Sequence, residues 1–408
     1  MRVDLLTREY PPNIYGGAGV HVDELSRVLA EHAEVHVHAF DGERGPDESV
    51  PGVTVKGYDY LDGLEGNDAL KTFGVDLQMV GGTEGADIVH SHTWYANLGG
   101  HLAGLLHGIP HVLSAHSLEP LRPWKREQLA GGYELSSFAE RTAYEGAAGI
   151  VAVSNGMRDD ILRSYPTVDP DKVEVIHNGI DLDSWKRPDS LEDAEKYFRS
   201  YGLDPDRPTV IFVGRITRQK GLPHLLRAVA QLPPEIQVLL CAGRPDTEEI
   251  ANEVKTLVEE LQKDREGIVW IDEHLTREKM VSLQVMSTTF VTPSVYEPLG
   301  IVNLEAMACG IPVVGSATGG IPDCINHGET GLLVPIDQLD DGTGTPRDPE
   351  QFEVDLAAAL TEVCSDLDRA REMGLAGRKR VEEHFSWESI AVKTMDFYTR
   401  VIDRFQVN

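Results

Sequence analysis

The sequence predicts an α/β fold made of two doubly wound, Rossmann-like domains, each built on a parallel sheet. Three observations predict it: a length of 408 residues, short β-branched runs that are almost continuously apolar, and a helical pattern between consecutive runs. Single hydrophobic cores stop growing near about 250–300 residues, so a chain of this length is expected to form two domains. Apolar strands that alternate with helices indicate parallel sheets covered on both faces.

The candidate strands fall into two series, which a polar, proline-bearing stretch from about 181 to 208 separates. The first series comprises Val3–Leu6, Glu34–Ala39, Ile88–Ser91, His111–Ala115, Gly149–Val153 and Val173–Ile176. The second comprises Thr209–Val213, Gln237–Ala242, Ile268–Ile271, Thr289–Thr292, Pro312–Val314 and Leu332–Val334. Ligands of such sheets bind beyond the carboxyl ends of the strands, so functional residues are expected there.

Helical stripes occupy the segments between these strands. Examples are Val20, Leu25, Val28 and Leu29, and then Leu98, Leu102, Leu105 and Leu106. After Gly377 the pattern is helical to the end, with an interruption near His384–Ser386. We expect an N-terminal domain over residues 1–184, a C-terminal domain over 185–385, and a closing helix over 386–408 that packs back on the first domain.

Composition excludes several classes of partner. The chain has 37 Lys and Arg against 67 Asp and Glu, a net charge of −30, which disfavours nucleic acid and anionic membranes. No stretch approaches the roughly 18 apolar residues of a membrane span, and no signal peptide is evident. The four cysteines lack metal-site spacing, which indicates reduced thiols in a cytoplasmic protein. The expected partner is a small molecule. A homodimer is one assembly that the sequence leaves open.

A glycine-rich loop follows the first predicted strand. Gly16 and Gly17 precede a helix that starts near Val20. Glycines let backbone approach a ligand, and a helix N-terminus attracts phosphate. The frame Gly17-x-Gly19 continues with Val22 where the dinucleotide fingerprint needs glycine, and no Walker sequence occurs. The loop is therefore either a ligand contact or a tight turn, and a dinucleotide-dependent dehydrogenase is disfavoured.

Two cations open the second domain. Arg215 directly follows an apolar strand, and Lys220 stands five positions on, before a helix. Arginine binds two phosphate oxygens at once and lysine supplies a compact point charge, so the pair predicts a diphosphate clamp. The alternative is a solvated basic turn.

Two glutamates follow the strand Thr289–Thr292. Pro298 favours an extended backbone at Glu297 and can start a helix, on which Glu305 then lies about two turns in. Carboxylates accept hydrogen bonds from sugar hydroxyls, so the pair could bind a hexose and a ribose. The peptide N–H groups near Leu299 and Gly300 could bind phosphate between them.

Histidines end two strands of the first domain. His116 follows the strand His111–Ala115 and is a candidate for either a catalytic or a structural role. His90-x-His92 would place two imidazoles on one strand face, but no third ligand stands nearby in the sequence, so no metal site is expected.

Three motifs together resemble the GT-B retaining glycosyltransferases of family 4. They are the Glu297-x7-Glu305 pair, the Gly-Arg-x4-Lys-Gly element from Gly214 to Gly221, and the Gly16-Gly17 loop. The resemblance runs over essentially the whole chain. Residues 6–12, 16–21 and 115–125 look more similar still to the short actinobacterial glycogen synthases, the group that includes the maltose-1-phosphate synthases.

The resemblance implies two Rossmann-like domains that face a central cleft, ADP-glucose as donor, no metal, and transfer with retention to form an α-1,4 bond. The acceptor would be glucose 1-phosphate or the end of a glycogen or maltooligosaccharide chain. Arg215 and Lys220 would stabilise the departing ADP, Glu297 would hold the glucose and Glu305 the ribose. The resemblance also implies that Gly16 and Gly17 approach the donor and that His116 lines the glucose pocket.

Two further segments bear on the acceptor. Arg122, Trp124 and Lys125 could receive the phosphate of glucose 1-phosphate, with the indole stacked on the sugar. Alternatively, they could form a solvated loop or an inter-domain contact. Thr93 stands where longer bacterial glycogen synthases have an aspartate, so the contact that this aspartate makes is in doubt here.

Two alternatives stay open, and the first of them shares every donor motif. One is another family 4 glycosyltransferase that uses a UDP- or GDP-sugar, and the other is a nucleotide-sugar epimerase of GT-B architecture, which needs no acceptor.

Overall fold

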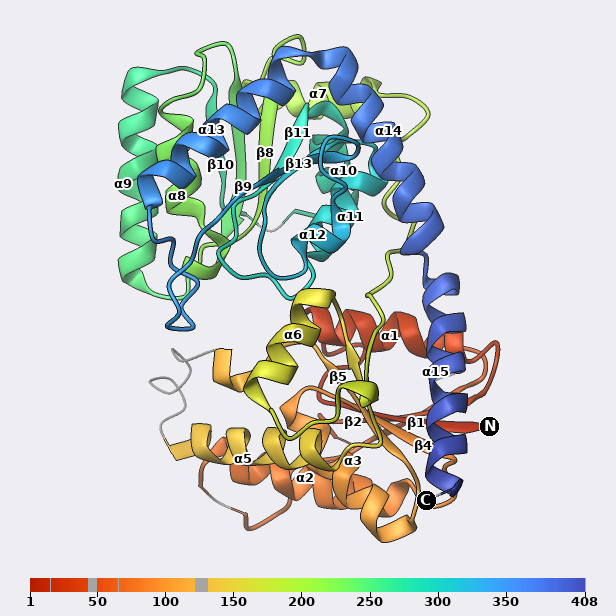
Figure 1. Cartoon of the computed structure of the whole chain (residues 1–408). Helices are drawn as coiled ribbons and strands as arrows, with labels where there is room; N and C mark the ends of the chain where they lie inside the picture. Colours follow the sequence, from red (N-terminus) through yellow and green to blue (C-terminus); the bar gives the residue numbers. More distant parts are fainter. Residues whose placement is uncertain (15, 43–49, 65, 122–130, 274, 408) are drawn as a thin grey trace. The chain divides into compact units, whose positions relative to one another are not determined.

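The computed structural model describes residues 1–14, 16–42, 50–64, 66–121, 131–273 and 275–407. The chain divides into two compact units, which are Met1–Gly179 with Trp387–Asn408, and Ile180–Ser386 (Figure 1). The chain thus leaves the first unit after residue 179 and returns to it at residue 387. From the sequence we expected these two boundaries after residues 184 and 385. Both units are α/β with one parallel sheet, as predicted.

Among the residues described, the sheet of the first unit has seven strands in the order β3-β2-β1-β4-β5-β6-β7, all parallel. Their bounds are β1 Arg2–Thr7, β2 Glu34–Ala39, β3 Val53–Gly57, β4 Ile88–His92, β5 His111–Ala115, β6 Gly149–Ala152 and β7 Val173–Val175. The order reverses between β1 and β4, and such a switch point is where open α/β sheets bind ligands.

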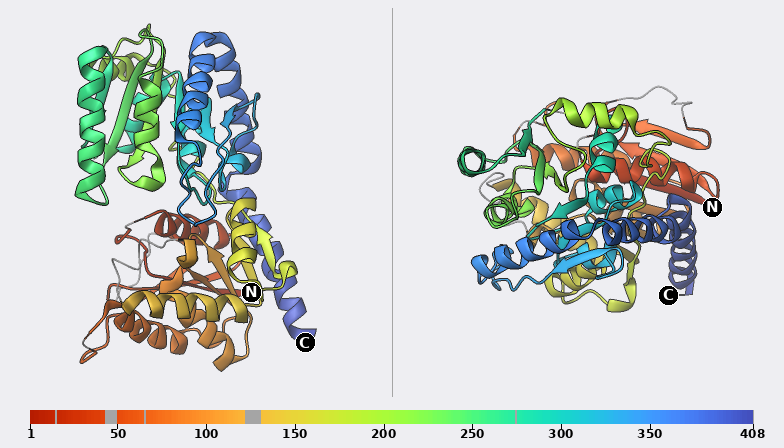
Figure 2. Two further views of the ribbon diagram at one scale, coloured as in Figure 1. Left: turned by 60° about the vertical axis from the view of Figure 1, so that its left-hand side comes forward. Right: turned by 90° about the horizontal axis from the view of Figure 1, so that it is seen from above.

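Helices cover both faces of this sheet. One layer consists of α2 Asp68–Gly82, α3 Trp94–His107 and α5 Gly131–Gly146 (Figure 2). The other includes α1 Gly17–Leu29 and α15 Trp387–Val407, whose buried residues share one core with β1, β2 and β3. The described part of this unit also contains α6 Asn155–Ser164 and the short 3-10 turns η1 Glu119–Leu121 and η2 Pro170–Lys172. The end of the chain therefore completes the core of its beginning.

The second unit repeats the pattern with the parallel order β10-β9-β8-β11-β12-β13. Its strands are β8 Thr209–Arg215, β9 Gln237–Gly243, β10 Ile268–Ile271, β11 Thr289–Thr292, β12 Val313–Ser316 and β13 Gly331–Val334. Its helices are α7 Glu192–Ser200, η3 Arg218–Lys220, α8 Leu222–Val229, α9 Glu248–Asp264, α10 Arg277–Met286, α11 Ile301–Ala308, α12 Ile321–Cys324, α13 Pro349–Ser365 and α14 Leu367–His384. The switch point here lies between β8 and β11.

All twelve predicted strands form, within two residues of their expected bounds. The sequence prediction missed β3, an edge strand in which Thr54 and Lys56 give a half-exposed pattern instead of an apolar run. None of the helices in the described part of the chain is both long and apolar enough to cross a bilayer.

Candidate functional site

The turn after β8 places Lys220 beside the segment that follows β11. Gly221 ends this turn with φ of 65°, and a Cβ there would lie 1.9 Å from the carbonyl oxygen of Pro293. Only glycine permits both the dihedral and the close approach. The Thr217 hydroxyl accepts a hydrogen bond of 3.2 Å from the Lys220 backbone N–H and so fixes the turn.

Lys220 and Glu297 form an ion pair at the β8/β11 switch point. The Lys220 Nζ lies 2.6 Å from Glu297 Oε2, and the two side chains are only 19% and 9% exposed. Ser294 Oγ donates to the same carboxylate oxygen at 3.2 Å. Within the described part of the chain, Glu297 Oε1 makes no further hydrogen bond, so this oxygen can accept one from a ligand hydroxyl.

The loop after β12 holds the backbone of Glu297. The Gly320 N–H donates to the Glu297 carbonyl oxygen at 2.8 Å. A Cβ on Gly319, whose φ is 55°, would lie 2.1 Å from that oxygen. Two loops that are distant in sequence therefore fix the position of one carboxylate.

Glu305 lies on α11 and is partly exposed, with Leu299 and Gly300 at the start of that helix. Burial raises the pKa of Glu305 to about 7, while the nearby charges of Arg277 and Lys220 lower it. Its carboxylate forms no hydrogen bond or ion pair with any other residue that the structure describes. It is a second carboxylate available to a ligand, and its charge changes near neutral pH.

Arg215 differs from Lys220 in its surroundings. Its side chain is 57% exposed, and Nη1 lies 2.8 Å from Asp246 Oδ1. The structure therefore brings Lys220 and Glu297 into direct contact, whereas Arg215 has a carboxylate partner of its own.

In the first unit, Glu9 closes the glycine-rich loop. The Gly16 N–H donates to Glu9 Oε2 at 2.7 Å, at the start of α1. A Cβ on Gly19 would lie 2.7 Å from the Glu9 Cβ, so the loop packs tightly on this residue. Gly17 is the first residue of α1. The amide of Gly16, a residue expected to approach the donor, thus donates to a carboxylate.

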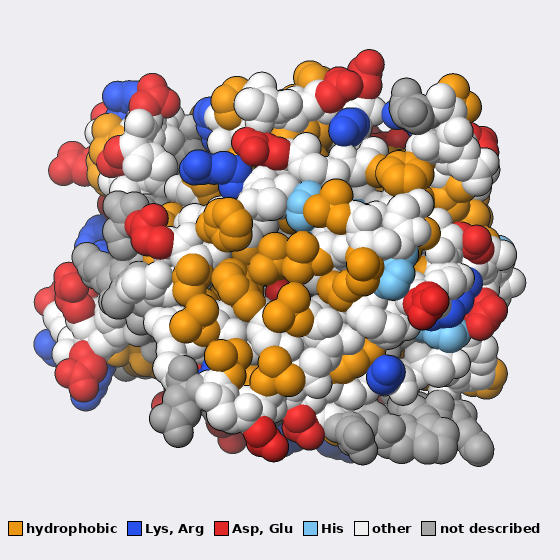
Figure 3. Space-filling view, turned by 90° about the horizontal axis from the view of Figure 1, so that it is seen from below, with side chains coloured by type: hydrophobic (Ala, Val, Ile, Leu, Met, Phe, Trp, Pro, Cys, Tyr) orange, Lys and Arg blue, Asp and Glu red, His pale blue; other side chains and the backbone are white. Residues whose placement is uncertain are grey.

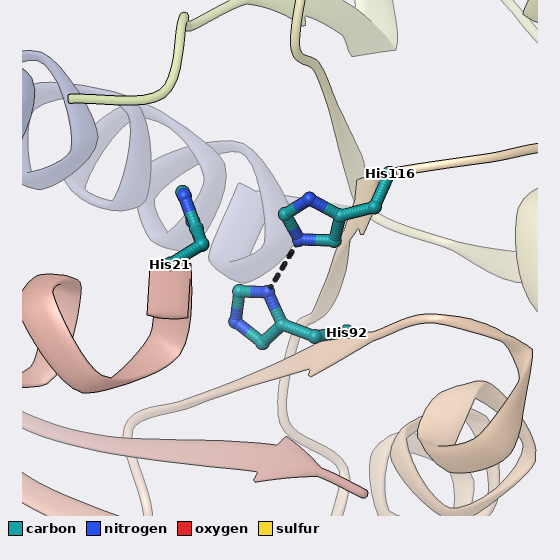
Figure 4. A group of neighbouring side chains, drawn as sticks. All are labelled: His21, His92 and His116. Carbon is teal, nitrogen blue, oxygen red and sulfur yellow. Dashed lines mark hydrogen bonds between the residues drawn. The ribbon is translucent and has the colours of Figure 1, made fainter. Parts of the chain in front are cut away.

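Three histidines meet at the carboxyl ends of β4 and β5 (Figure 4). His92 ends β4, His116 follows β5, and His21 reaches them from α1. His92 Nδ1 lies 3.1 Å from His116 Nε2 in a hydrogen bond. One nitrogen of each ring lies within 4.8 Å of the other two.

Burial keeps these imidazoles neutral near pH 7. It lowers the pKa of His116 to about 4 and lowers the pKa of His21 and His92 well below the usual value, and the proximity of the other rings lowers both further. The amide of Asn178 opposes the effect at His21. His90 faces different partners, since Nδ1 lies 2.6 Å from Tyr398 Oη and Nε2 lies 2.9 Å from Ser114 Oγ.

Thr93 lies just before α3 and has a φ of 65°, which is rare for a β-branched residue and costs of order 1–3 kcal/mol. Its hydroxyl makes no cap hydrogen bond to the helix. Such strained backbone often occurs at functional sites, so Thr93 stays a candidate. Arg122, Trp124 and Lys125 lie outside the described residues, and their expected roles stay predictions.

The sequence prediction missed His21 and Ser294 as site residues. His21 lies one turn after the glycine-rich loop, and this position near an expected ligand contact could have identified it from the sequence. Ser294 stands three residues before Glu297 on the same strand-end loop.

Comparisons with known proteins agree with this architecture. Residues 15–184 match the family model described as Glycosyltransferase Family 4, and residues 193–342 match the one described as Glycosyl transferases group 1. Alpha-maltose-1-phosphate synthase of Mycolicibacterium smegmatis is 51% identical over 402 residues, which cover 98% of this chain and 100% of that protein. The synthase of the same name from Mycobacterium tuberculosis is 48% identical over 401 residues, with coverage of 98% and 100%.

Among solved structures, sucrose-phosphate synthase from Thermosynechococcus elongatus superposes with a TM-score of 0.76 at 25% identity, and 99% of each chain is covered. The fold neighbours are glycosyltransferases of the GT-B class, which have two Rossmann-like domains. The chain therefore belongs to glycosyltransferase family 4 and is a glycosyltransferase.

Proposed function

We propose that this protein is a retaining glucosyltransferase that moves glucose from ADP-glucose to glucose 1-phosphate and so forms an α-1,4 bond in α-glucan synthesis. The observation that carries the proposal is the Lys220–Glu297 pair at the β8/β11 switch point. The substrates come from similarity, since two proteins named alpha-maltose-1-phosphate synthase are 51% and 48% identical to almost the whole chain. Four free, buried cysteines support a reducing compartment such as the cytoplasm.

The donor roles follow from the contacts in the second unit. The Lys220 ammonium has three donors, so it can hold Glu297 and still bind a phosphate oxygen. Glu297 Oε1 would accept a hydrogen bond from a glucose hydroxyl, and Glu305 would accept one from a ribose hydroxyl. Arg215 is exposed and would shift from Asp246 to the diphosphate. The start of α11, at Leu299 and Gly300, adds the positive end of a helix dipole.

The reaction breaks the bond between glucose C1 and the β-phosphate oxygen of ADP-glucose and forms one between C1 and the acceptor O4. The acceptor hydroxyl proton passes to the departing phosphate oxygen on the same face, which retains the anomeric configuration. Lys220 and Arg215 would stabilise the charge that develops on the diphosphate, and this role needs no metal ion. His116, neutral because of burial, would contact the transferred glucose.

The test is to supply ADP-glucose, UDP-glucose and GDP-mannose, each with glucose 1-phosphate or with glycogen, and to identify the products by NMR. We expect maltose 1-phosphate with an α linkage from ADP-glucose and glucose 1-phosphate. Lys220→Ala should lower kcat by orders of magnitude while ADP-glucose still binds detectably. Near-normal turnover in this variant would contradict the role of Lys220.

Other products would identify other functions. Extension of glycogen alone would make a glucan end the acceptor. A preference for UDP- or GDP-sugars would indicate another family 4 activity. Conversion of the donor sugar without any acceptor would indicate an epimerase.

A further inference from the structure

We propose that His21, His92 and His116 bind a divalent transition-metal ion such as Zn²⁺, with one coordination position left open to water or a ligand oxygen. All three residues belong to the first unit and come from α1, β4 and the segment after β5 (Figure 4). Three imidazoles with a fourth, open position are a recognised zinc arrangement.

The spacing of the rings fits one ion. Two nitrogens bound tetrahedrally to zinc at about 2.0–2.1 Å lie about 3.3–3.4 Å apart. His92 Nδ1 and His116 Nε2 are 3.1 Å apart, so only the third nitrogen has to come closer. The ring centroids are separated by 4.8, 5.4 and 5.5 Å, and the same bond lengths place the centroids of three zinc-bound imidazoles about 5 Å apart.

The cluster also contains nitrogens that lack a partner. His21 is 4% exposed, and neither of its ring nitrogens makes a hydrogen bond of ordinary geometry within the described residues, although Asn178 lies near. A buried polar group without a partner costs about 1–3 kcal/mol, which coordination would offset. Nitrogen ligands select zinc and similar metals over Mg²⁺ and Ca²⁺, which prefer oxygen.

A metal here would inhibit the proposed reaction. It would bind His116, the residue that we expect to contact glucose, so Zn²⁺ should compete with the sugar substrates. This consequence rests on the proposed function, whereas metal binding itself does not.

The test is a titration of the untagged, full-length protein with Co²⁺, read by the intense visible absorption of tetrahedral Co²⁺. We expect one Co²⁺ per chain, displaced by Zn²⁺ and not by Mg²⁺. His21→Ala should weaken binding at least about 100-fold, since even outer-shell changes cost about 10- to 100-fold. His32→Ala is the matched control, because His32 is an exposed histidine just after α1 and should not affect binding.

The titration of the wild-type protein tests metal binding even if a variant fails to fold. Absence of saturable tetrahedral Co²⁺ binding in the wild-type protein overturns the proposal, as does equal binding by His21→Ala and His32→Ala. Inhibition by Zn²⁺ is read separately. A site that binds Co²⁺ as expected while Zn²⁺ leaves turnover unchanged would refute the role of His116 and not the metal site.

A second, independent inference concerns the outer face of α2, α3 and α5, onto which Figure 3 looks. Hydrophobic side chains gather there, and the most exposed of them are Leu70 at 41%, Leu77 at 59%, Leu105 at 70%, Leu106 at 68% and Phe138 at 58%. The opposite side of α3 packs against β4 and β5 and consists of small or apolar residues apart from Asn97. A helix that is apolar all round is normally buried, so we infer that this outer face, called here the leucine face, is covered by another molecule.

The lack of charge on the leucine face favours a second copy of this chain as the partner. The net charge of −30 makes two copies repel over most of their surface, and they can approach only where side chains are uncharged. A basic partner would instead be held by carboxylates, and the five side chains of the leucine face are apolar. Two copies related by a two-fold axis would bury the same face on each.

The test is the mass in solution, measured by light scattering at micromolar concentration. We expect a mass of twice 44.9 kDa for the wild-type chain and a monomer for Leu105→Glu. Leu375→Glu is the matched control, since Leu375 is also a helical leucine with 70% exposure but lies on α14, and this variant should stay dimeric. A monomeric wild-type chain, or dimers that survive both Leu105→Glu and Phe138→Glu, would overturn the inference.

Discussion

The Lys220–Glu297 ion pair gives the sharpest quantitative prediction. Lys220→Met removes the ammonium but keeps most of the apolar stem, so it leaves the Glu297 carboxylate without its cation. Removing one partner of a buried ion pair costs about 3–5 kcal/mol, whereas an exposed pair contributes about 0–1 kcal/mol. The two side chains are 19% and 9% exposed and Ser294 still donates to the carboxylate, so we take the lower end, about 3 kcal/mol.

This loss of unfolding free energy corresponds to a lower melting temperature. A domain of 150–250 residues loses about 2–4 °C for each kcal/mol, so the second unit, Ile180–Ser386, should melt about 6–12 °C lower in Lys220→Met. Arg218→Met is the matched control in the same turn. Its partners are Glu249 and Glu253, and its side chain is 64% exposed, so it should cost less than about 1 kcal/mol.

Differential scanning calorimetry is the assay, because a chain of two units need not unfold in one transition. The variants Lys220→Met, Glu297→Gln and their combination form a double-mutant cycle. We expect a coupling energy of about 1–3 kcal/mol, because both single changes disrupt the same contact. The cycle is measured without substrate, so it separates the ion pair from any role in donor binding.

Two outcomes would refute this reasoning. Lys220→Met could destabilise the second unit no more than Arg218→Met does. Alternatively, the two single losses could simply add in the double variant, which would mean that Lys220 and Glu297 act independently.

Three further predictions concern other contacts. Burial raises the pKa of Glu305 from 4.5 to about 7, so the folded protein holds this proton more tightly than the unfolded chain. As the pH rises from 4.5 to about 7, the wild-type protein should therefore lose up to about 3 kcal/mol of unfolding free energy relative to Glu305→Gln. Equal pH dependence of the two unfolding free energies would contradict the shift. Gly221→Ala should lower the melting temperature more than Gly202→Ala does, since both residues have positive φ but only Gly221 meets a carbonyl oxygen at 1.9 Å; similar losses by calorimetry would refute the packing argument. Tyr398→Phe should cost about 1–3 kcal/mol in denaturant unfolding, because it leaves the buried His90 Nδ1 without its 2.6 Å partner; an unchanged midpoint would show that the bond contributes little.

The sequence predicted the helices and strands well, but it predicted less well which of their side chains are buried. Parallel strands buried on both faces are apolar along their whole length, so a run such as Gly149–Ala152 can be recognised from its own residues. The edge strand β3 was missed because half of it faces solvent. The stripe Leu98, Leu102, Leu105 and Leu106 was recognised as helical, but periodicity could not tell that Leu105 and Leu106 face outward.

By itself, then, the sequence determined the α/β class, nearly all the strands and the candidate residues Arg215, Lys220, Glu297 and Glu305, because each depends on a local pattern of side chains. Only the tertiary structure decided which of these side chains touch. It joined Lys220 to Glu297 across 77 positions of sequence and His90 to Tyr398 across 308, and it gathered His21, His92 and His116 from three elements. Such contacts depend on the order of strands in a sheet, which brings carboxyl ends together regardless of their distance along the chain.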